Sequence, residues 1–109
     1  MALKRKVRQI GNSLALPIPG EVFEFLGFNY KDIKYKLIQE ITGEVYILIL
    51  KKDVIALEEK KFQKLGNTPA IIIPKPLCIM WNIGLEEGKN RELLIEFDDS
   101  PLKWKLYCN

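Results

Sequence analysis

The chain has 109 residues, of which 48% are hydrophobic and 28% are charged, a composition typical of one globular domain and not of a disordered protein. It contains no histidine and two cysteines outside any CxxC pair, which excludes catalytic triads built on a histidine base and the common zinc motifs. The net charge of +3 is modest and by itself identifies no partner.

No segment is expected to enter a membrane. The longest apolar run, residues 45–50, is far shorter than the ~20 residues that span a bilayer. The N-terminal residues "MALKRKVRQ" have no apolar core after their basic residues, so they do not predict a secretory signal. We therefore expect a cytoplasmic protein.

Basic residues crowd the N-terminus. Lys4, Arg5, Lys6 and Arg8 lie within the first ten residues, with no acidic residue among them. Residues 1–55 carry nine basic and six acidic residues, whereas the rest of the chain carries eight of each, so all the excess positive charge lies in the first half. Contact with a polyanion and a solvated N-terminus both explain such a cluster, and charge alone leaves the two interpretations open.

Two strands joined by a tight turn are predicted next. Residues 4–10 and 14–18 favour strands, and Gly11-Asn12-Ser13 between them suits a reversal, because glycine accepts a positive φ and asparagine tolerates it. Pro19 cannot donate to a sheet but fits the first turn of a helix. The apolar residues of that helix are Val22, Phe23, Phe25 and Leu26. Their spacing predicts one buried face, and Gly27 is expected to end the helix.

A hairpin follows this helix. Residues 33–40 and 45–50 flank Thr42-Gly43. The second of these strands, "VYILIL", is apolar on both faces, which favours the centre of a small barrel over the edge of an open sheet. The segment 51–61 is either a short linker or a helical turn, and its lack of Ser and Gly predicts tightly joined halves.

The second half repeats this order of elements. Gly11, Asn12, Ala15, Ile18 and Pro19 recur 55 positions later as Gly66, Asn67, Ala70, Ile73 and Pro74. A match of this density at one offset indicates an internal repeat. We therefore expect strands at residues 61–65 and 70–73, and then a helix that begins at Pro74 and ends at Gly84. A hairpin is expected at 92–97 and 103–107, with Trp104 and Leu106 facing inward.

The second helix differs from the first at one position. Its apolar residues Leu77, Cys78, Met80 and Trp81 keep the spacing of the first helix, so we expect them in the core. Ile79 stands where the first helix has Glu24. It indicates either an asymmetric contact surface or deeper burial of the second helix, and we favour deeper burial.

The repeated pattern resembles the SpoVT/AbrB group, which includes the DNA-binding domains of MazE-type antitoxins. The specific residues are "GNSLALPIP" and "GNTPAIIIP", followed each time by a short amphipathic helix and a hairpin. The resemblance implies a swapped-hairpin barrel, mainly β with two short helices. Residues 1–55 and 56–109 would be the two repeats of one pseudo-dimeric domain.

The resemblance also implies contacts with double-stranded DNA from the first strand and the following loop of each repeat. Together with the neighbouring basic residues, the candidate DNA-binding residues are Lys4, Arg5, Lys6, Arg8, Gln9, Asn12 and Ser13 in the first repeat, and Lys61, Gln63, Lys64, Asn67 and Thr68 in the second. Gln63 is uncharged where Arg8 is charged, and Pro17 and Ile72 are apolar where relatives are often basic. The second repeat is therefore expected to hold DNA less strongly or to read a different half-site.

The sequence leaves the role of the turn asparagines open but favours a functional role for Arg8. Asparagine in a Gly-Asn turn serves the backbone conformation, a DNA contact, or both. Arg8 has no folding task that the sequence reveals, so we expect it to be functional.

The leading functional hypothesis is a sequence-preferring DNA-binding transcriptional regulator. The alternative is an antitoxin-like protein-binding module, which is less favoured because the chain ends soon after Tyr107 and leaves no toxin-wrapping arm. Further self-association of the pseudo-dimer is left open. The acidic pairs Glu86-Glu87 and Asp98-Asp99 lie in predicted turns, and no phosphate-binding loop or activated nucleophile is visible, so we expect neither an enzyme nor a cofactor.

Overall fold

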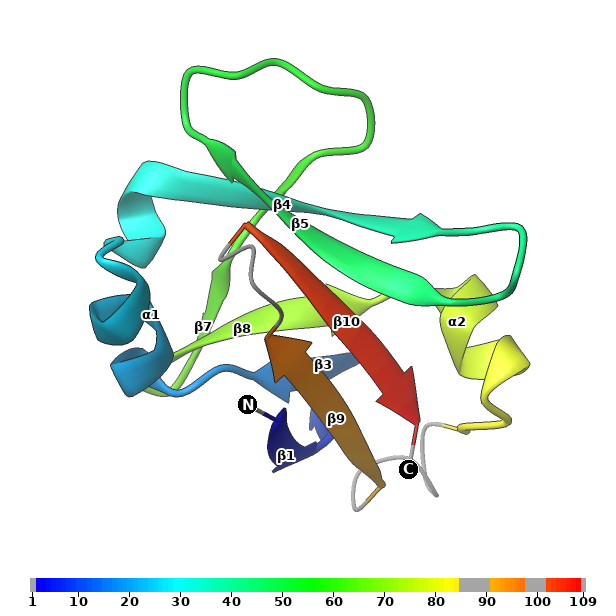
Figure 1. Cartoon of the computed structure of the whole chain (residues 1–109). Coiled ribbons are helices and arrows are strands. Elements are labelled where there is room, and N and C mark those ends of the chain that lie inside the picture. Colours follow the sequence, from blue (N-terminus) through cyan, green and yellow to red (C-terminus); the bar gives the residue numbers. More distant parts are fainter. Residues whose placement is uncertain (1, 85–90, 98–101, 109) are drawn as a thin grey trace.

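The computed structural model of the chain describes residues 2–84, 91–97 and 102–108, and the predicted turns at residues 86–90 and 98–101 lie outside these ranges. The described part is mainly β with two short α-helices, which confirms the expected fold class at this level. Its strands form a six-stranded sheet that curls like half a barrel and a smaller four-stranded sheet (Figure 1).

The two sheets are antiparallel throughout their described pairs. The six-stranded sheet has the order β1 (Ala2–Lys6), β9 (Glu92–Phe97), β10 (Lys103–Cys108), β5 (Val45–Lys51), β4 (Ile33–Gln39) and β6 (Lys60–Lys61). The four-stranded sheet has the order β2 (Arg8–Ile10), β3 (Ser13–Pro17), β8 (Thr68–Ile73) and β7 (Gln63–Leu65). The helices α1 (Gly20–Leu26) and α2 (Lys75–Met80) lie at opposite ends of the molecule, and a 3₁₀ turn, η1 (Tyr30–Asp32), precedes β4 (Figure 1).

Strand pairing joins the two halves of the chain in both sheets. In the larger sheet β1 pairs with β9, β10 with β5, and β6 with β4. In the smaller sheet β3 pairs with β8. If each strand is exchanged for its counterpart in the repeat, both strand orders read the same in reverse. The arrangement therefore has a two-fold symmetry of connection that matches the repeat in the sequence.

The first predicted strand of each half is two strands in the structure. β1 and β2 meet at Val7, and β6 and β7 meet at Phe62, which is 55 positions later. Both side chains are buried, at 0% and 8% exposure, and the Val7 N–H donates to the Arg91 carbonyl at 2.7 Å. The prediction of continuous strands at 4–10 and 61–65 was wrong, because each buried side chain marks the place where the chain passes from one sheet to the other.

The hydrophobic core draws buried side chains from both sheets. The four-stranded sheet contributes Leu14, Leu16, Ile71 and Ile73, and the six-stranded sheet contributes Tyr35, Ile47, Ile95, Trp104 and Leu106. β5 is paired on both sides, and its residues are alternately buried and half-buried. The predictions of a central "VYILIL" strand and of inward-facing Trp104 and Leu106 are therefore confirmed.

The helices bury fewer side chains than their sequence pattern predicts. Val22 and Phe23 are buried in α1, and Leu77 is buried in α2. Phe25 is 76% exposed and Met80 is 39% exposed, so the prediction that they belong to the core was wrong. A helix of six or seven residues makes about two turns, and only the residues that point directly at the sheets reach the core.

Ile79 is also exposed, at 74%. The favoured expectation of deeper burial for this residue was therefore wrong, and the alternative of an asymmetric surface stands. Its counterpart Glu24 is exposed as well, so the two helices present the same position to solvent with different chemistry.

The two helices end in the same way, but only the first ends at the expected residue. Gly27 closes α1 with φ 77°, as predicted. In α2 the helix ends before Gly84, and the corresponding position is Asn82, with φ 54°. The N–H of Phe28 donates to Phe23 at 3.0 Å, and that of Ile83 donates to Cys78 at 2.8 Å, so the same closing hydrogen bond recurs 55 positions later. The prediction of Gly84 as the helix end was wrong because asparagine can also adopt the left-handed conformation.

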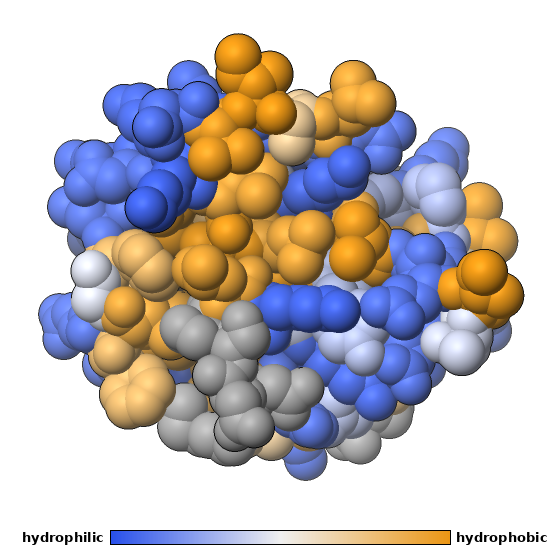
Figure 2. All heavy atoms as spheres, turned by 45° about the horizontal axis from the view of Figure 1, so that its top comes forward, coloured by the Kyte–Doolittle hydropathy of each residue, from blue (hydrophilic) through white to orange (hydrophobic). Residues whose placement is uncertain are grey.

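The connection between the halves is an irregular loop and not a helical turn. It presents Ile55 and Leu57 to solvent at 92% and 83% exposure. Figure 2, in which this side of the molecule comes forward, shows hydrophobic side chains gathered in a band across the surface. In the described part of the chain no helix has the length and apolar character needed to cross a membrane.

Candidate nucleic-acid interface

The four-stranded sheet has one face against the core and one face directed outward. Leu14, Leu16 and Ile71 belong to the core cluster and share the inner face. Side chains of adjacent residues in a strand point to opposite faces, so Ala15 and Ile72, which pair across β3 and β8, lie on the outer face. Ile72 is half-buried there, whereas the small side chains of Ala15 and Ala70 at the centre of this face are buried, at 0% and 1% exposure. Arg8 pairs with Ala15 and therefore lies on this outer face too, where it is exposed.

A second row of the outer face mirrors the first. Gln63 pairs with Ala70, and Ala70 pairs with Pro17. The row Gln63, Ala70, Pro17 therefore corresponds to the row Arg8, Ala15, Ile72 with the halves exchanged. Arg8 and Gln63 occupy equivalent positions on opposite edge strands, and the outer face is positively charged at one of them only.

The Gly-Asn turns lie at opposite ends of this sheet, because β3 and β8 are antiparallel. Gly11 and Gly66 have positive φ values of 58° and 66°, whereas Asn12 and Asn67 do not. Ile10 pairs with Ser13, so the turn has two central residues, and a positive φ at the first alone is typical of type II′. The glycines therefore supply the special backbone conformation, and the asparagines are not needed for it.

The asparagine side chains are open. Both residues are exposed, and neither side chain has a hydrogen-bond partner among the described residues. By contrast, Gln9 folds back on its own turn and donates from Nε2 to the Gly11 carbonyl at 3.0 Å. Asn12 and Asn67 are thus free to contact a ligand, while Gln9 supports the turn.

The N-terminal basic residues do not form one patch with Arg8. Lys4 and Lys6 are exposed and pair with Leu94 and Glu92 of β9, which alternate along that strand with the buried residues Leu93 and Ile95. They therefore lie on the outer face of the larger sheet, as does Lys61, which pairs with Lys34. The bend at Val7 separates Lys4 and Lys6 from the outer face of the smaller sheet, and Lys61 lies next to the corresponding bend at Phe62.

Of the twelve predicted residues, the structure gathers four on the outer face of the smaller sheet and two in the turns at its ends. The four are Arg8, Ser13, Gln63 and Thr68, and the two are Asn12 and Asn67. Gln9 and Lys64 alternate with them on the edge strands. Arg5 pairs with buried Leu93 and is half-buried at the edge of the larger sheet.

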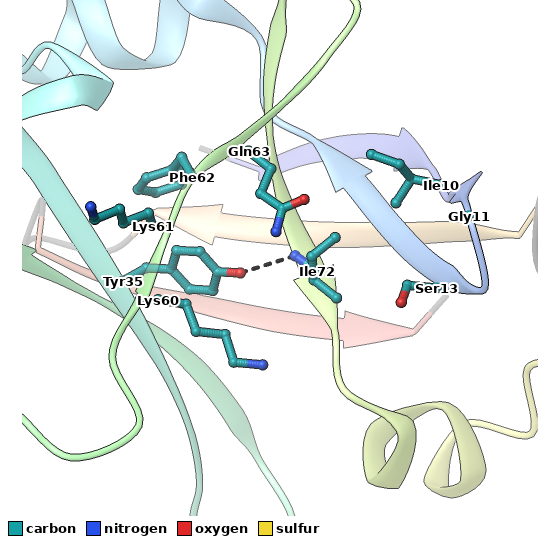
Figure 3. Close-up of a pocket in the computed structure, with 9 residues that line it drawn as sticks. All are labelled: Ile10, Gly11, Ser13, Tyr35, Lys60, Lys61, Phe62, Gln63 and Ile72. Carbon is teal, nitrogen blue, oxygen red and sulfur yellow. Dashed lines mark hydrogen bonds between the residues drawn. The ribbon is translucent and has the colours of Figure 1, made fainter.

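A groove of about 820 Å³ crosses the outer face and joins both halves of the chain (Figure 3). It is lined by Ile10, Gly11 and Ser13 from the first half, Tyr35 from β4, and Lys60, Lys61, Phe62, Gln63 and Ile72 from the second half. Lys60 is not among the residues predicted from the sequence. The repeat itself carries the signal that finds it, because Lys60 lies 55 positions after Arg5.

Tyr35 fixes one wall of this groove. Its hydroxyl oxygen accepts a hydrogen bond from the Ile72 N–H at 3.0 Å (Figure 3). Burial raises the pKa of Tyr35, so it remains a neutral phenol. The counterpart of Ile72 in the first half is Pro17, which has no N–H that needs a hydrogen-bond partner.

An ion pair between buried Lys34 and half-buried Glu59 holds the connecting loop beside the groove. Lys34 is 8% exposed, and its Nζ donates to the Val54 carbonyl and to Glu59 Oε1, both at 2.8 Å. The Ala56 N–H donates to Glu59 Oε2 at 3.0 Å. The hydrogen bond from Lys34 is the main cause of a lowered pKa for Glu59, and the Ala56 N–H adds to it. The carboxylate nearest to Lys60 in the sequence is therefore already paired.

Comparison of the chain with protein-family models, with curated proteins and with solved structures finds no match. Among the described residues, no group of three or more Cys, Asp or Glu side chains is placed to hold a metal ion.

Proposed function

We propose that this protein binds double-stranded DNA through the outer face of its four-stranded sheet and acts as a sequence-preferring transcriptional regulator. Within that class, we assign it to the swapped-hairpin barrels of the SpoVT/AbrB kind, with the two halves of one chain in place of two subunits. The reversed strand orders support this assignment, because β1 joins the hairpin of the second half and β6 joins that of the first.

The observation that carries the proposal is the composition of the outer face. It presents the exposed Arg8, and the exposed side chains of Asn12 and Asn67, which have no hydrogen-bond partner among the described residues, lie at its two ends. Thr68 and Ile73, the two ends of β8, are about 17 Å apart at ~3.3 Å per residue, which is less than one turn of duplex DNA. Arginine recognises guanine bidentately and asparagine recognises adenine, so these side chain types suit the major groove.

The test is a fluorescence-anisotropy titration with duplexes obtained by site selection. Arg8→Gln is expected to weaken binding about ten- to hundredfold, because a good bidentate base contact contributes roughly 1–3 kcal/mol. Lys105→Gln removes the same charge from the outer face of the larger sheet, where Lys105 alternates with buried Trp104 and Leu106. An equal effect of the two substitutions, or no measurable binding at low salt, would overturn the proposal.

A protein-binding module remains the second candidate, and the surface beside α2 favours it. A hollow of about 520 Å³ is lined by Cys78, Ile79 and Asn12 among others. Cys78 is half-buried beside this hollow, whereas its counterpart in the first half is the larger Phe23, which is buried at 3% exposure. If this surface binds a protein, Ile79→Glu, which copies Glu24 of the first half, will abolish a stoichiometric complex.

A further inference from the structure

Lys60 is a cationic side chain in the groove on the outer face, and the repeat has a second cation, Arg5, at the equivalent position of the first half. Lys60 pairs with Tyr35 across β6 and β4, and Arg5 pairs with Leu93 across β1 and β9. Tyr35 and Leu93 are both 0% exposed, so Lys60 and Arg5 lie on the inner face of the larger sheet, at its two edges. Each cation thus stands beside the smaller sheet, at positions related by the symmetry of the strand orders.

The side chain of Lys60 extends into the groove. Figure 3 shows it running alongside the Tyr35 ring, with its ammonium group on the side of Ile72 and Ser13, whereas Lys61 points the opposite way. Ile72 forms part of the floor, and the Gln63 amide is directed toward it (Figure 3). The groove therefore combines an apolar floor with the ammonium group of Lys60, the amide of Gln63 and the hydroxyl groups of Ser13 and Tyr35.

The charges around Lys60 leave it available. Among the described residues no acidic side chain lines the groove. Glu59 is paired with Lys34 at 2.8 Å. Glu58 shares a neighbouring hollow with Lys60, but no ion pair joins the two in the described part of the chain.

We propose that this groove receives the sugar–phosphate backbone of one DNA strand, with Lys60 contacting a phosphate. The inference rests on the proposed function and adds the backbone contact of the second half. Charge complementarity selects the occupant, since an ammonium group binds phosphate as a point charge, and hydroxyl and amide groups donate to phosphate oxygens. Lys60 thereby supplies positive charge to the half in which Gln63 replaces Arg8, and Arg5 makes the equivalent contact in the first half.

The experiment measures duplex affinity as a function of salt for the full chain. Lys60→Gln is expected to weaken binding about three- to tenfold and to reduce the slope of log K against log salt by about one, as for one lost phosphate contact. It should weaken all duplex sequences equally, because a phosphate contact reads no base. Lys105→Gln is the matched control and should leave the slope unchanged. Glu58→Gln should tighten binding, since it removes a negative charge from the neighbouring hollow that Glu58 shares with Lys60.

The outcomes separate this inference from the proposed function. Loss of affinity for Arg8→Gln with an unchanged slope for Lys60→Gln would overturn the groove contact alone. Absence of duplex binding by the unmodified chain would overturn both. A Lys60→Gln effect confined to one duplex sequence would also contradict a backbone contact. Thermal unfolding of each variant checks that the exposed Lys60 was removed without loss of the fold.

Discussion

At the scale of single residues, the two halves solve the same hydrogen-bonding problem in different ways. β8 continues beyond the end of β7, so the N–H of Ile72 lacks a strand partner and is satisfied by the Tyr35 hydroxyl. In β3 the equivalent residue is Pro17, which has no donor. Leu93, which pairs with Arg5 as Tyr35 pairs with Lys60, is the counterpart of Tyr35 and has no hydroxyl group.

Tyr35→Phe is expected to destabilise the fold by about 1–3 kcal/mol, because it leaves a half-buried N–H without a partner. Chemical denaturation of the full chain measures this loss. In an Ile72→Pro background the same change should cost almost nothing, since no donor remains. Equal losses in both backgrounds would show that the Tyr35 hydroxyl acts in some other way.

The ion pair between Lys34 and Glu59 predicts a pH dependence of stability. The pKa of Glu59 is lower in the folded chain than its ordinary value of 4.5, so its stabilising contribution is complete above that value. The contribution is lost as the pH falls through the lower, folded-state pKa. Glu59→Gln should therefore reduce the denaturation midpoint at pH 7 and have little effect at pH 2. A loss that is the same at both pH values would contradict this assignment.

At the scale of elements, Gly27 and Asn82, the left-handed residues that close the two helices, can be compared by substitution. Asn82→Ala should destabilise the chain by about 1 kcal/mol, and Asn82→Gly should leave it as stable or more stable, because glycine adopts φ 54° without strain. Gly27→Ala should cost about 1–2 kcal/mol at the matching position of α1. Urea denaturation at neutral pH ranks the three variants. A loss in Asn82→Gly would mean that the asparagine side chain itself is needed.

The positions of most elements could be predicted from the sequence, because their signals are local. Turn glycines, the prolines before the helices and the alternation in "KWKLY" each act through neighbouring residues. The break at Val7 has no local signal, since one buried valine in a strand looks the same whether or not the chain changes sheets. The exposure of Phe25 and Ile79 also depends on how few turns of each helix meet the sheets.

In the candidate site too, some residues could be predicted from local patterns and others depend on how distant strands pair. Arg8 and the two turn asparagines could be predicted because the repeated motif contains them. The separation of Lys4 and Lys6 from Arg8, and the place of Lys60 in the groove, depend on which sheet each short strand joins. That choice is made by pairing between residues about 90 positions apart for β1 and about 26 for β6, which no local pattern reveals.

At the scale of the whole molecule, neither half can complete its sheets alone. Residues 2–55 contain β1 without its partner β9, β3 without β8, and β5 without β10. Cleavage of the chain after Ile55, in the exposed connecting loop, should therefore give two fragments that are unfolded when separated and fold when mixed. Circular dichroism of each fragment and of the mixture tests this. A fragment that unfolds cooperatively as a monomer would contradict the shared core.

The contrast between Pro17 and Tyr35 has a consequence for the whole assembly. A protein made of two identical subunits must accept every substitution on both sides of its axis. This chain carries Pro17 on one side of the axis and, on the other, the Ile72 N–H that donates to the Tyr35 hydroxyl. The two sides of its four-stranded sheet are therefore chemically distinguishable. If it binds DNA as proposed, it will prefer one orientation on the duplex, and its recognition sequence will have a direction relative to the genes beside it.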